Sequence, residues 1–216
     1  MSPARILVAD DHDVVRQGLR SLIQEQPQWK IIAEVKDGRD AVAKASELKP
    51  DIAILDISMP SLNGLDATRQ ILKLNTHTKI LILSVHDSEQ MIENVLIAGA
   101  RGYVLKADAG SDLVRAMQAL LAGQTCFTQK ASQIILDGFV GKRPKATQGE
   151  SQVLTARERE ILQLLAEGKI SKEVATLLNL STKTVETHRT NLMRKLSCHC
   201  VSELVRYAVR NHLVEA

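Results

Sequence analysis

The stretch ARILVADD at residues 4–11 and the stretch IAILD at residues 52–56 decide the fold of this chain. Each is a short apolar run that ends in carboxylates, and helix-like sequence separates the two. This alternation is typical of a parallel α/β sheet, whose strands are buried on both faces. Functional groups in such sheets gather at the carboxyl ends of the strands, so we expect Asp10, Asp11 and Asp56 to lie at one edge.

Two further apolar runs end in residues that interact with phosphate. Residues 80–83 run into Ser84, and residues 102–105 run into Lys106. The same topological rule brings this hydroxyl group and this ammonium group to the edge that carries the carboxylates. Together these side chains predict a phosphorylation site.

Strand–helix units repeat through the first 123 residues. The expected strands cover residues 4–9, 30–35, 52–55, 80–83 and 102–105, and the expected helices cover 14–26, 39–48, 64–74, 88–98 and 111–122. Helical spacing of apolar residues and Gly or Pro punctuation mark these boundaries. Parallel strands joined by right-handed crossover helices predict an α/β fold, the (βα)5 flavodoxin-like sheet covered on both faces.

From residue 154 onward the sequence predicts helices only. Thr155 and Glu158 form a Thr-x-x-Glu capping box before an apolar helix, and Gly168 ends that helix. Ser181 caps a later helix. The remaining expected helices cover residues 171–178, 182–196 and 201–211. The short link between the first two of these is typical of a helix-turn-helix, so we expect a second, smaller all-α domain.

Charge and composition divide the chain in the same way. Residues 1–125 carry 14 basic and 16 acidic side chains, whereas residues 151–216 carry 10 and 7. Any nucleic-acid contact is therefore expected in the second half. The stretch GKRPKATQGESQ at 141–152 is almost without apolar residues and predicts a flexible linker. We expect one domain over 1–125, a linker over 126–152 with a further helix at 129–139, and a second domain over 153–216.

The sequence also argues against several classes of protein. No stretch approaches the ~20 apolar residues that span a bilayer, and the first residues lack a signal-peptide core. The three cysteines, Cys126, Cys198 and Cys200, form no even disulfide framework, so a reducing cytoplasm is expected. The Cys-His-Cys run at 198–200 lacks the usual spacing of a metal site, which favours free thiols.

A flavodoxin-like sheet could instead bind a flavin or a nucleotide. Such cofactors need glycines and exposed backbone N–H groups in the first turn of the fold. This chain has Asp10, Asp11, His12 and Asp13 there, and these carboxylates would repel a phosphate-bearing cofactor unless a cation intervened.

Clustered carboxylates are the ligands of a hard divalent cation, and Mg²⁺ suits two carboxylates, a carbonyl, waters and a phosphoryl oxygen. Such an ion would let Asp56 stay ionised as a nucleophile beside its acidic neighbours. Lys106 would then pair with the phosphoryl group, and Ser84 would hydrogen-bond to it.

Residues 4–123 resemble the receiver domain of bacterial two-component response regulators. The motifs that carry the resemblance are Asp10-Asp11, Asp56 followed by Ser58-Met59-Pro60, Gly64, Ser84 with Ala98-Gly99-Ala100 downstream, and Tyr103 three residues before Lys106. The resemblance implies that Asp56 accepts the phosphoryl group from a sensor histidine kinase. It implies that Asp10, Asp11, Asp56 and the backbone carbonyl of Ser58 bind Mg²⁺.

The resemblance also implies a switch, in which Ser84 moves toward the phosphoryl group and draws Tyr103 inward. His86 lies where receivers tune dephosphorylation, although a solvated loop histidine is an equal alternative. Many receivers follow the lysine with a proline through a cis peptide bond, whereas Ala107 follows Lys106 here. A cis bond before a non-proline residue costs roughly 2.5–4 kcal/mol, so this bond is either trans or strained.

Residues 154–213 resemble the LuxR-type (GerE-type) helix-turn-helix module. The matching stretches are Leu154-Thr155-x-Arg157-Glu158-x-Glu160-Ile161-Leu162, Ala166-x-Gly168, Lys172-Glu173-Val174-Ala175, Leu180-Ser181, Thr184-Val185-x-Thr187-His188, Asn191-Leu192 and Lys195-Leu196. With the receiver, this match identifies the chain as a member of the NarL/FixJ family of response regulators.

The third helix of this module is expected to read DNA. Lys183, Thr187, Thr190 and Arg194 form a polar stripe that can reach base edges or phosphates in a major groove, and Val185 and Leu192 mark the opposite stripe toward the core. Glu186 also lies on this surface, where it either accepts from cytosine N4 or lowers non-specific affinity. Phosphate contacts are expected from Lys172, Ser181, Thr182 and Thr184.

The resulting hypothesis is a phosphorylation-dependent DNA-binding transcription regulator. It acts as a homodimer on double-stranded DNA, with the last helix as a candidate dimer face and RNA polymerase as a further candidate partner. The receiver would support only its own phosphotransfer and slow autodephosphorylation. Two other classes stay open: a phosphohydrolase, which would need a substrate-binding cap, and a phosphate-sink receiver, which would need no DNA reader.

Overall fold

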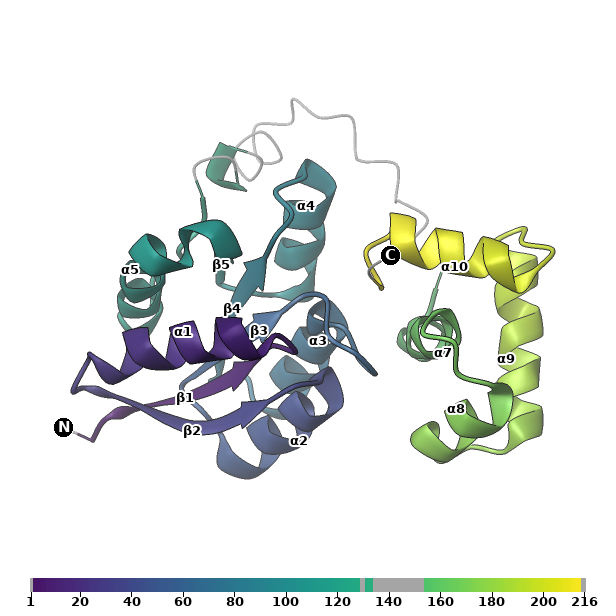
Figure 1. The fold of residues 1–216 in the computed structure, drawn as a ribbon, viewed down its shortest axis with the longest axis horizontal. Coiled ribbons are helices and arrows are strands. Elements are labelled where there is room, and N and C mark those ends of the chain that lie inside the picture. Colours follow the sequence, from purple (N-terminus) through teal and green to yellow (C-terminus); the bar gives the residue numbers. More distant parts are fainter. Residues whose placement is uncertain (1, 129–130, 134–153, 215–216) are drawn as a thin grey trace. The chain divides into compact units, whose positions relative to one another are not determined.

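The computed structural model describes residues 2–128, 131–133 and 154–214, and these fall into two compact units (Figure 1). Most of the helix expected at 129–139 and the linker stretch at 141–152 lie outside the described residues.

The first unit contains a parallel sheet with the strand order β2-β1-β3-β4-β5. The strands are β1 (Ala4–Ala9), β2 (Trp29–Val35), β3 (Ile52–Asp56), β4 (Lys79–Ser84) and β5 (Gly102–Leu105). Because the strand order runs outward in two directions from β1 and β3, the topological switch point lies between these two strands. Ligand sites of doubly wound sheets lie at this point, outside the carboxyl ends of the strands.

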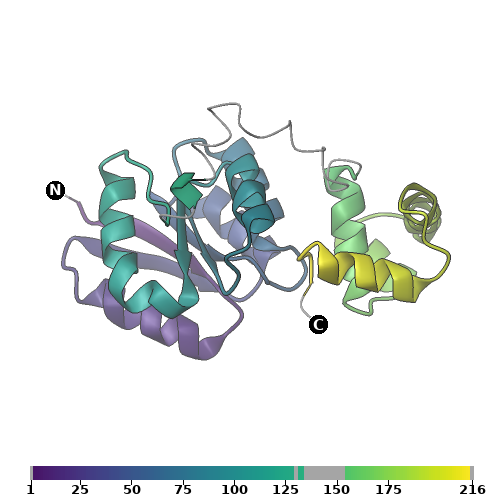
Figure 2. The ribbon, with the colours of Figure 1, turned by 90° about the horizontal axis from the view of Figure 1, so that it is seen from above.

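Helices cover both faces of the sheet, as the two views show (Figures 1 and 2). They are α1 (Asp13–Gln24), α2 (Gly38–Leu48), α3 (Gly64–Leu74), α4 (Glu89–Ala98) and α5 (Ala109–Leu121), with a 3-10 turn, η1 (Lys106–Asp108), before α5. Helices α1 and α5 lie on one face, and α2, α3 and α4 lie on the other. The (βα)5 flavodoxin-like prediction is confirmed.

Burial on both faces explains why the central strands β1 and β3 contain continuous apolar runs. Every side chain of Ile52–Leu55 is fully buried, and those of Ile6–Ala9 are exposed by at most 1%. These strands thus form the centre of the core, and the polar side chains of Asp10 and Asp56 follow where their apolar runs end. This arrangement fixes the place of the functional groups at the carboxyl edge.

The second unit is all-helical. Its helices are α7 (Ala156–Ala166), α8 (Ser171–Leu178), α9 (Thr182–Lys195) and α10 (Val201–Arg210). The predicted capping box is present, because the Thr155 hydroxyl accepts from the Glu158 N–H while the Glu158 carboxylate accepts from the Thr155 N–H. Helix α8 ends at Leu178, the next residue, Asn179, adopts the left-handed conformation, and the chain then turns into α9.

A separate apolar cluster holds these helices together. Its members include Ile161, Leu165, Val174, Val185 and Leu192, contributed by α7, α8 and α9. Helix α10 adds Leu204 and Ala208. Among the described residues, no helix is both long enough and apolar enough to cross a membrane.

Candidate functional site

Three acidic side chains meet at the carboxyl edge of the sheet. Asp10 and Asp11 follow β1, and Asp56 ends β3, the neighbouring strand; the pair Ala9 and Leu55 shows the register that brings them together. One carboxylate oxygen from each, together with a ring nitrogen of His12, lies within 4.8 Å of the others. The predicted convergence of these groups is therefore present in the fold.

Lys106 reaches the same point from the end of β5. Its Nζ lies 2.9 Å from Oδ2 of Asp56 and 2.9 Å from Oδ2 of Asp10. Burial and the two carboxylates act on it in opposite directions: burial lowers the pKa of Lys106, but hydrogen bonding and charge from Asp56 and Asp10 outweigh it and raise that pKa. Lys106 is therefore a fixed cation at neutral pH.

Asp56 is the carboxyl group whose ionisation is most disturbed. Only 2% of its surface is exposed, and this burial is the main reason why its pKa rises from 3.8 to about 6. The negative charge of Asp10 also raises this pKa. Lys106 lowers the pKa but offsets only part of this rise. The carboxylate form is thus destabilised unless a further cation binds beside it.

The donor set suits a hard cation. Oδ2 of Asp10 and Oδ2 of Asp56 are both buried, and Lys106 Nζ, 2.9 Å from each, is the cation that they share. Carboxylate oxygens in this state are suitable ligands for Mg²⁺. Ser58, whose carbonyl is the other predicted ligand, lies in the half-buried turn that follows β3.

Gly64 is needed for the turn that follows Asp56. Its N–H donates to the carbonyl of Ile57 (2.8 Å), and a Cβ atom at position 64 would lie 2.0 Å from the carbonyl oxygen of Asp56. Only glycine allows the start of α3 to approach this closely. The backbone beyond the acceptor is thereby held in place.

Ser84 and Tyr103 are linked through the backbone of His86. The His86 N–H donates to Ser84 Oγ (3.0 Å), and the Tyr103 hydroxyl donates to the His86 carbonyl. Tyr103 is 1% exposed, so its ring already lies inward in this structure. The Lys106–Ala107 peptide bond is trans, since the described residues contain no cis bond.

Two residues of this site carry no role in the sequence-based prediction. The Nδ1 atom of His12 lies 2.8 Å from Asp11 Oδ1 and 3.2 Å from Asp10 Oδ1. Arg16, buried in α1, donates to the carbonyl of Asp10. The only available signal was their position just after the Asp-Asp pair, because the contacts depend on how α1 turns away from β1.

In the second unit, α9 presents the predicted polar stripe to solvent. Lys183, Glu186, Thr187, Thr190 and Arg194 are all exposed, whereas Val185 and Leu192 are fully buried. The Ser181 hydroxyl caps the helix by accepting from the Thr184 N–H (3.0 Å). Of the predicted phosphate contacts, Lys172, Ser181 and Thr182 are exposed and Thr184 is half-buried.

Two basic residues of this unit are engaged within it. Lys195 Nζ lies 2.7 Å from both carboxylate oxygens of the buried Glu158. Arg157 pairs with Glu160 and donates to the carbonyl of Leu178, which lies at the end of α8. These contacts join α7 to α9 and α7 to α8.

Comparison with known proteins agrees with both halves of the fold. The response regulator receiver domain family matches residues 6–118, and the bacterial regulatory proteins of the luxR family match residues 152–208. The chain is 39% identical over 215 residues to the oxygen regulatory protein NreC of Staphylococcus aureus, covering 98% of this chain and 99% of that one.

Solved structures are similar over nearly the whole chain. The response regulator RcsB of Salmonella typhimurium is 26% identical with a TM-score of 0.64, covering 98% of this chain and 99% of that one. RcsB of Salmonella enterica serovar Typhimurium, bound to promoter rprA in the presence of the phosphomimetic BeF3−, is 26% identical with a TM-score of 0.61, covering 95% and 98%.

The fold and these matches define a two-domain signalling protein. The chain belongs to the NarL/FixJ family of response regulators, with a receiver domain followed by a LuxR-type helix-turn-helix domain. It is a DNA-binding transcription regulator that depends on phosphorylation.

Proposed function

We propose that Asp56 accepts a phosphoryl group from a histidine kinase and that this event controls DNA binding by α9. A carboxylate oxygen of Asp56 would attack the phosphorus atom of a phosphohistidine, so that a P–O bond forms as the P–N bond breaks. The observation that carries the proposal is the meeting of Asp56, Asp10 and Lys106 at 2.9 Å contacts on one buried edge.

The neighbours of Asp56 have separate roles in this proposal. Asp10, Asp11, Asp56 and the Ser58 carbonyl would hold Mg²⁺, which when bound neutralises charge on the phosphoryl oxygens. Lys106 lies close enough to move its ammonium group from Asp56 to an added phosphoryl oxygen. Burial of Asp10 and Asp56 keeps bulk water away from the acyl phosphate and so favours slow autodephosphorylation.

Ser84 and Tyr103 would report the phosphorylation state. Ser84 Oγ now accepts from the His86 N–H, so a shift of Ser84 toward the phosphoryl group changes the segment that also binds the Tyr103 hydroxyl. Because Tyr103 is already inward, we propose that phosphorylation stabilises this inward state over others.

For the output, we propose that α9 enters the major groove. Lys183, Glu186, Thr187, Thr190 and Arg194 would face the bases and the nearby phosphates. Lys172, Ser181, Thr182 and Thr184 would contact phosphates near the start of α9. Two copies would dimerise through α10 and so bind two half-sites. On α10, Val201 is 39% exposed and Val205 and Val209 are half-buried.

We also propose domain limits of 1–125 and 153–216, with 126–152 as the linker. The family matches at 6–118 and 152–208 support these limits.

The protein would act in the cytoplasm, where its proposed DNA target lies, and RNA polymerase is a candidate partner at promoters. We expect no turnover of small phosphomonoesters, because the proposed acceptor forms a lasting acyl phosphate.

Phosphate uptake tests the acceptor directly. The full chain would be incubated with acetyl phosphate and Mg²⁺ and then analysed by mass spectrometry of its peptides. We expect one added phosphoryl group on Asp56, none in Asp56→Asn, and normal uptake in the exposed control Asp40→Asn. Equal uptake by Asp56→Asn, or modification at another residue, would overturn the assignment.

A further inference from the structure

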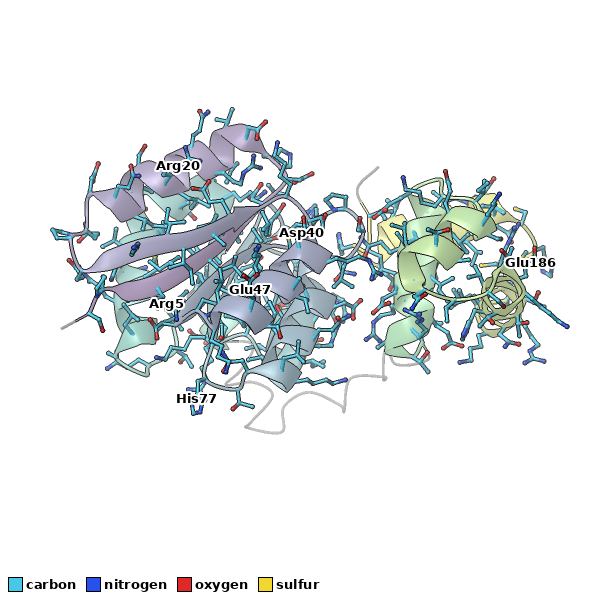
Figure 3. The ribbon with its side chains drawn as sticks, turned by 90° about the horizontal axis from the view of Figure 1, so that it is seen from below. Arg5, Arg20, Asp40, Glu47, His77 and Glu186 are labelled. Atoms are coloured by element: carbon cyan, nitrogen blue, oxygen red, sulfur yellow. The ribbon has the colours of Figure 1, made fainter. Side chains whose placement is uncertain are left out.

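Glu186 is a negative charge on the surface proposed to face DNA. It projects from the outer side of α9 (Figure 3). Lys183 and Arg194 lie on the same face, and the helical rise of about 1.5 Å per residue separates them by roughly 16 Å. Glu186 lies between these cations, about one turn from Lys183.

Within residues 154–214, Glu186 is the one glutamate that forms no ion pair and accepts no hydrogen bond through its carboxylate. The other five each have a partner inside this unit: Lys195 for Glu158, Arg157 for Glu160, Gln163 for Glu167, Ile170 N–H for Glu173 and His199 N–H for Glu203. Its carboxylate is therefore fully available to a ligand.

The two neighbouring threonines lack a free donor in this structure. The Thr187 hydroxyl donates to the Lys183 carbonyl (2.9 Å), and the Thr190 hydroxyl donates to the Glu186 carbonyl (3.0 Å). Their oxygens can still accept hydrogen bonds. The middle of the α9 face therefore presents acceptors, while donors lie at its two ends.

An unpaired carboxylate on this face is repelled by phosphates, unless a base supplies a hydrogen-bond donor. Cytosine presents the N4 amino donor in the major groove, whereas adenine places the N7 acceptor next to its N6 donor and would repel the second carboxylate oxygen. We propose that Glu186 specifies cytosine at one position of the DNA site that α9 reads. This inference rests on the proposed DNA-binding function of α9.

Selection from a random-sequence duplex library tests the inference. The full chain, treated with beryllium fluoride and Mg²⁺, would be compared with Glu186→Gln, Glu186→Ala and Glu25→Gln. The last variant removes the same charge from an exposed position at the end of α1 and serves as the control. Affinity for the selected duplex and for its single-base variants would follow by fluorescence anisotropy.

We expect the unaltered chain and the control to enrich cytosine at one position. Glu186→Gln should enrich adenine there, because a carboxamide matches the N6 and N7 pair of adenine, and Glu186→Ala should enrich no base. Replacing that cytosine should weaken binding of the unaltered chain about tenfold. Selection of the same site by all four proteins would overturn the role of Glu186 alone. Failure of the unaltered chain to enrich any sequence would overturn the proposed DNA-reading function as well.

Discussion

Asp56 lies where its own negative charge is unfavourable. Burial is the main cause of its raised pKa, and Asp10 adds to the effect, while Lys106 offsets part of it. A carboxylate in this position gains more from a bound cation than an exposed carboxylate would. The environment that disfavours the negative charge of Asp56 therefore favours a cation beside it.

This environment predicts a pH-dependent gain of stability in Asp56→Asn. Because the pKa of the folded state, about 6, lies above the ordinary value of 3.8, the native state binds the proton more tightly than the unfolded state. The stability of the unaltered protein should therefore fall as pH rises from about 4 to 6. The variant lacks this loss, so above pH 6 its free energy of unfolding should be higher, by at most roughly 3 kcal/mol.

Urea denaturation without divalent cations, between pH 4 and pH 8, measures this difference. The control Asp40→Asn, at an exposed position of α2, should change stability by less than about 0.5 kcal/mol. A difference between Asp56→Asn and the unaltered protein that does not depend on pH would contradict the burial argument.

Lys195 and Arg194 are adjacent basic residues with different predicted roles. Lys195 pairs with Glu158, which is 5% exposed, whereas Arg194 is exposed and, among the described residues, bonds only to Asn191 on its own helix. Lys195→Met should lower the free energy of unfolding by about 1–3 kcal/mol, because it leaves a buried carboxylate without its cation. Arg194→Met should leave stability unchanged and lower DNA affinity, with a salt slope reduced by about one.

Thermal unfolding and salt-dependent anisotropy separate the two effects. If Arg194→Met destabilises the fold while Lys195→Met does not, the assignment of these side chains is reversed.

At the scale of elements, the positions of strands and helices follow closely from local sequence. The strand Gly102–Leu105 and the helices Gly64–Leu74 and Ser171–Leu178 have the predicted bounds. Helix α1 ends at Gln24 instead of residue 26, since its last turn closes at Glu25 before Pro27. The spacing of apolar residues and the positions of Gly and Pro are properties of short segments, which is why these boundaries could be predicted.

Side-chain contacts between elements were harder to predict from the sequence. The pair Lys195–Glu158 joins residues 37 positions apart, and no periodic pattern marks it. Asp10, Asp56 and Lys106 were predictable because topology alone brings strand ends together. His12 and Arg16 were missed as members of the site because their contacts depend on side-chain rotamers at the start of α1.

The start of α3 offers a test of how tightly an element holds the acceptor. In Gly64→Ala, the new Cβ would meet the Asp56 carbonyl oxygen at 2.0 Å, so the backbone must move. We expect a loss of about 1–3 kcal/mol of stability and slower phosphorylation by acetyl phosphate. The control Gly18→Ala, inside α1 with open space around it, should gain about 0.5–1 kcal/mol.

Stability by urea denaturation and phosphorylation by mass spectrometry would be measured on both variants. Normal stability and normal uptake in Gly64→Ala would show that this close approach is not required.

At the scale of the whole molecule, the function depends on coupling between two units that fold around separate apolar cores. The receiver unit carries the phosphorylation chemistry, and the helical unit carries the polar stripe of α9. The phosphorylation site and the polar stripe of α9 lie in different units. A signal therefore has to act by shifting the equilibrium between conformations of the full chain. NreC and RcsB each match over 98% of this chain, so both units lie within the matched length.

The affinity of the full chain for its selected duplex, with and without beryllium fluoride and Mg²⁺, tests the central claim most directly. We expect the phosphate mimic to tighten binding at least about tenfold, a shift of about 1.4 kcal/mol, and to favour a dimer in sedimentation. Asp56→Asn should show neither change. Equal affinity and equal oligomeric state of the unaltered chain under both conditions would contradict phosphorylation control through Asp56.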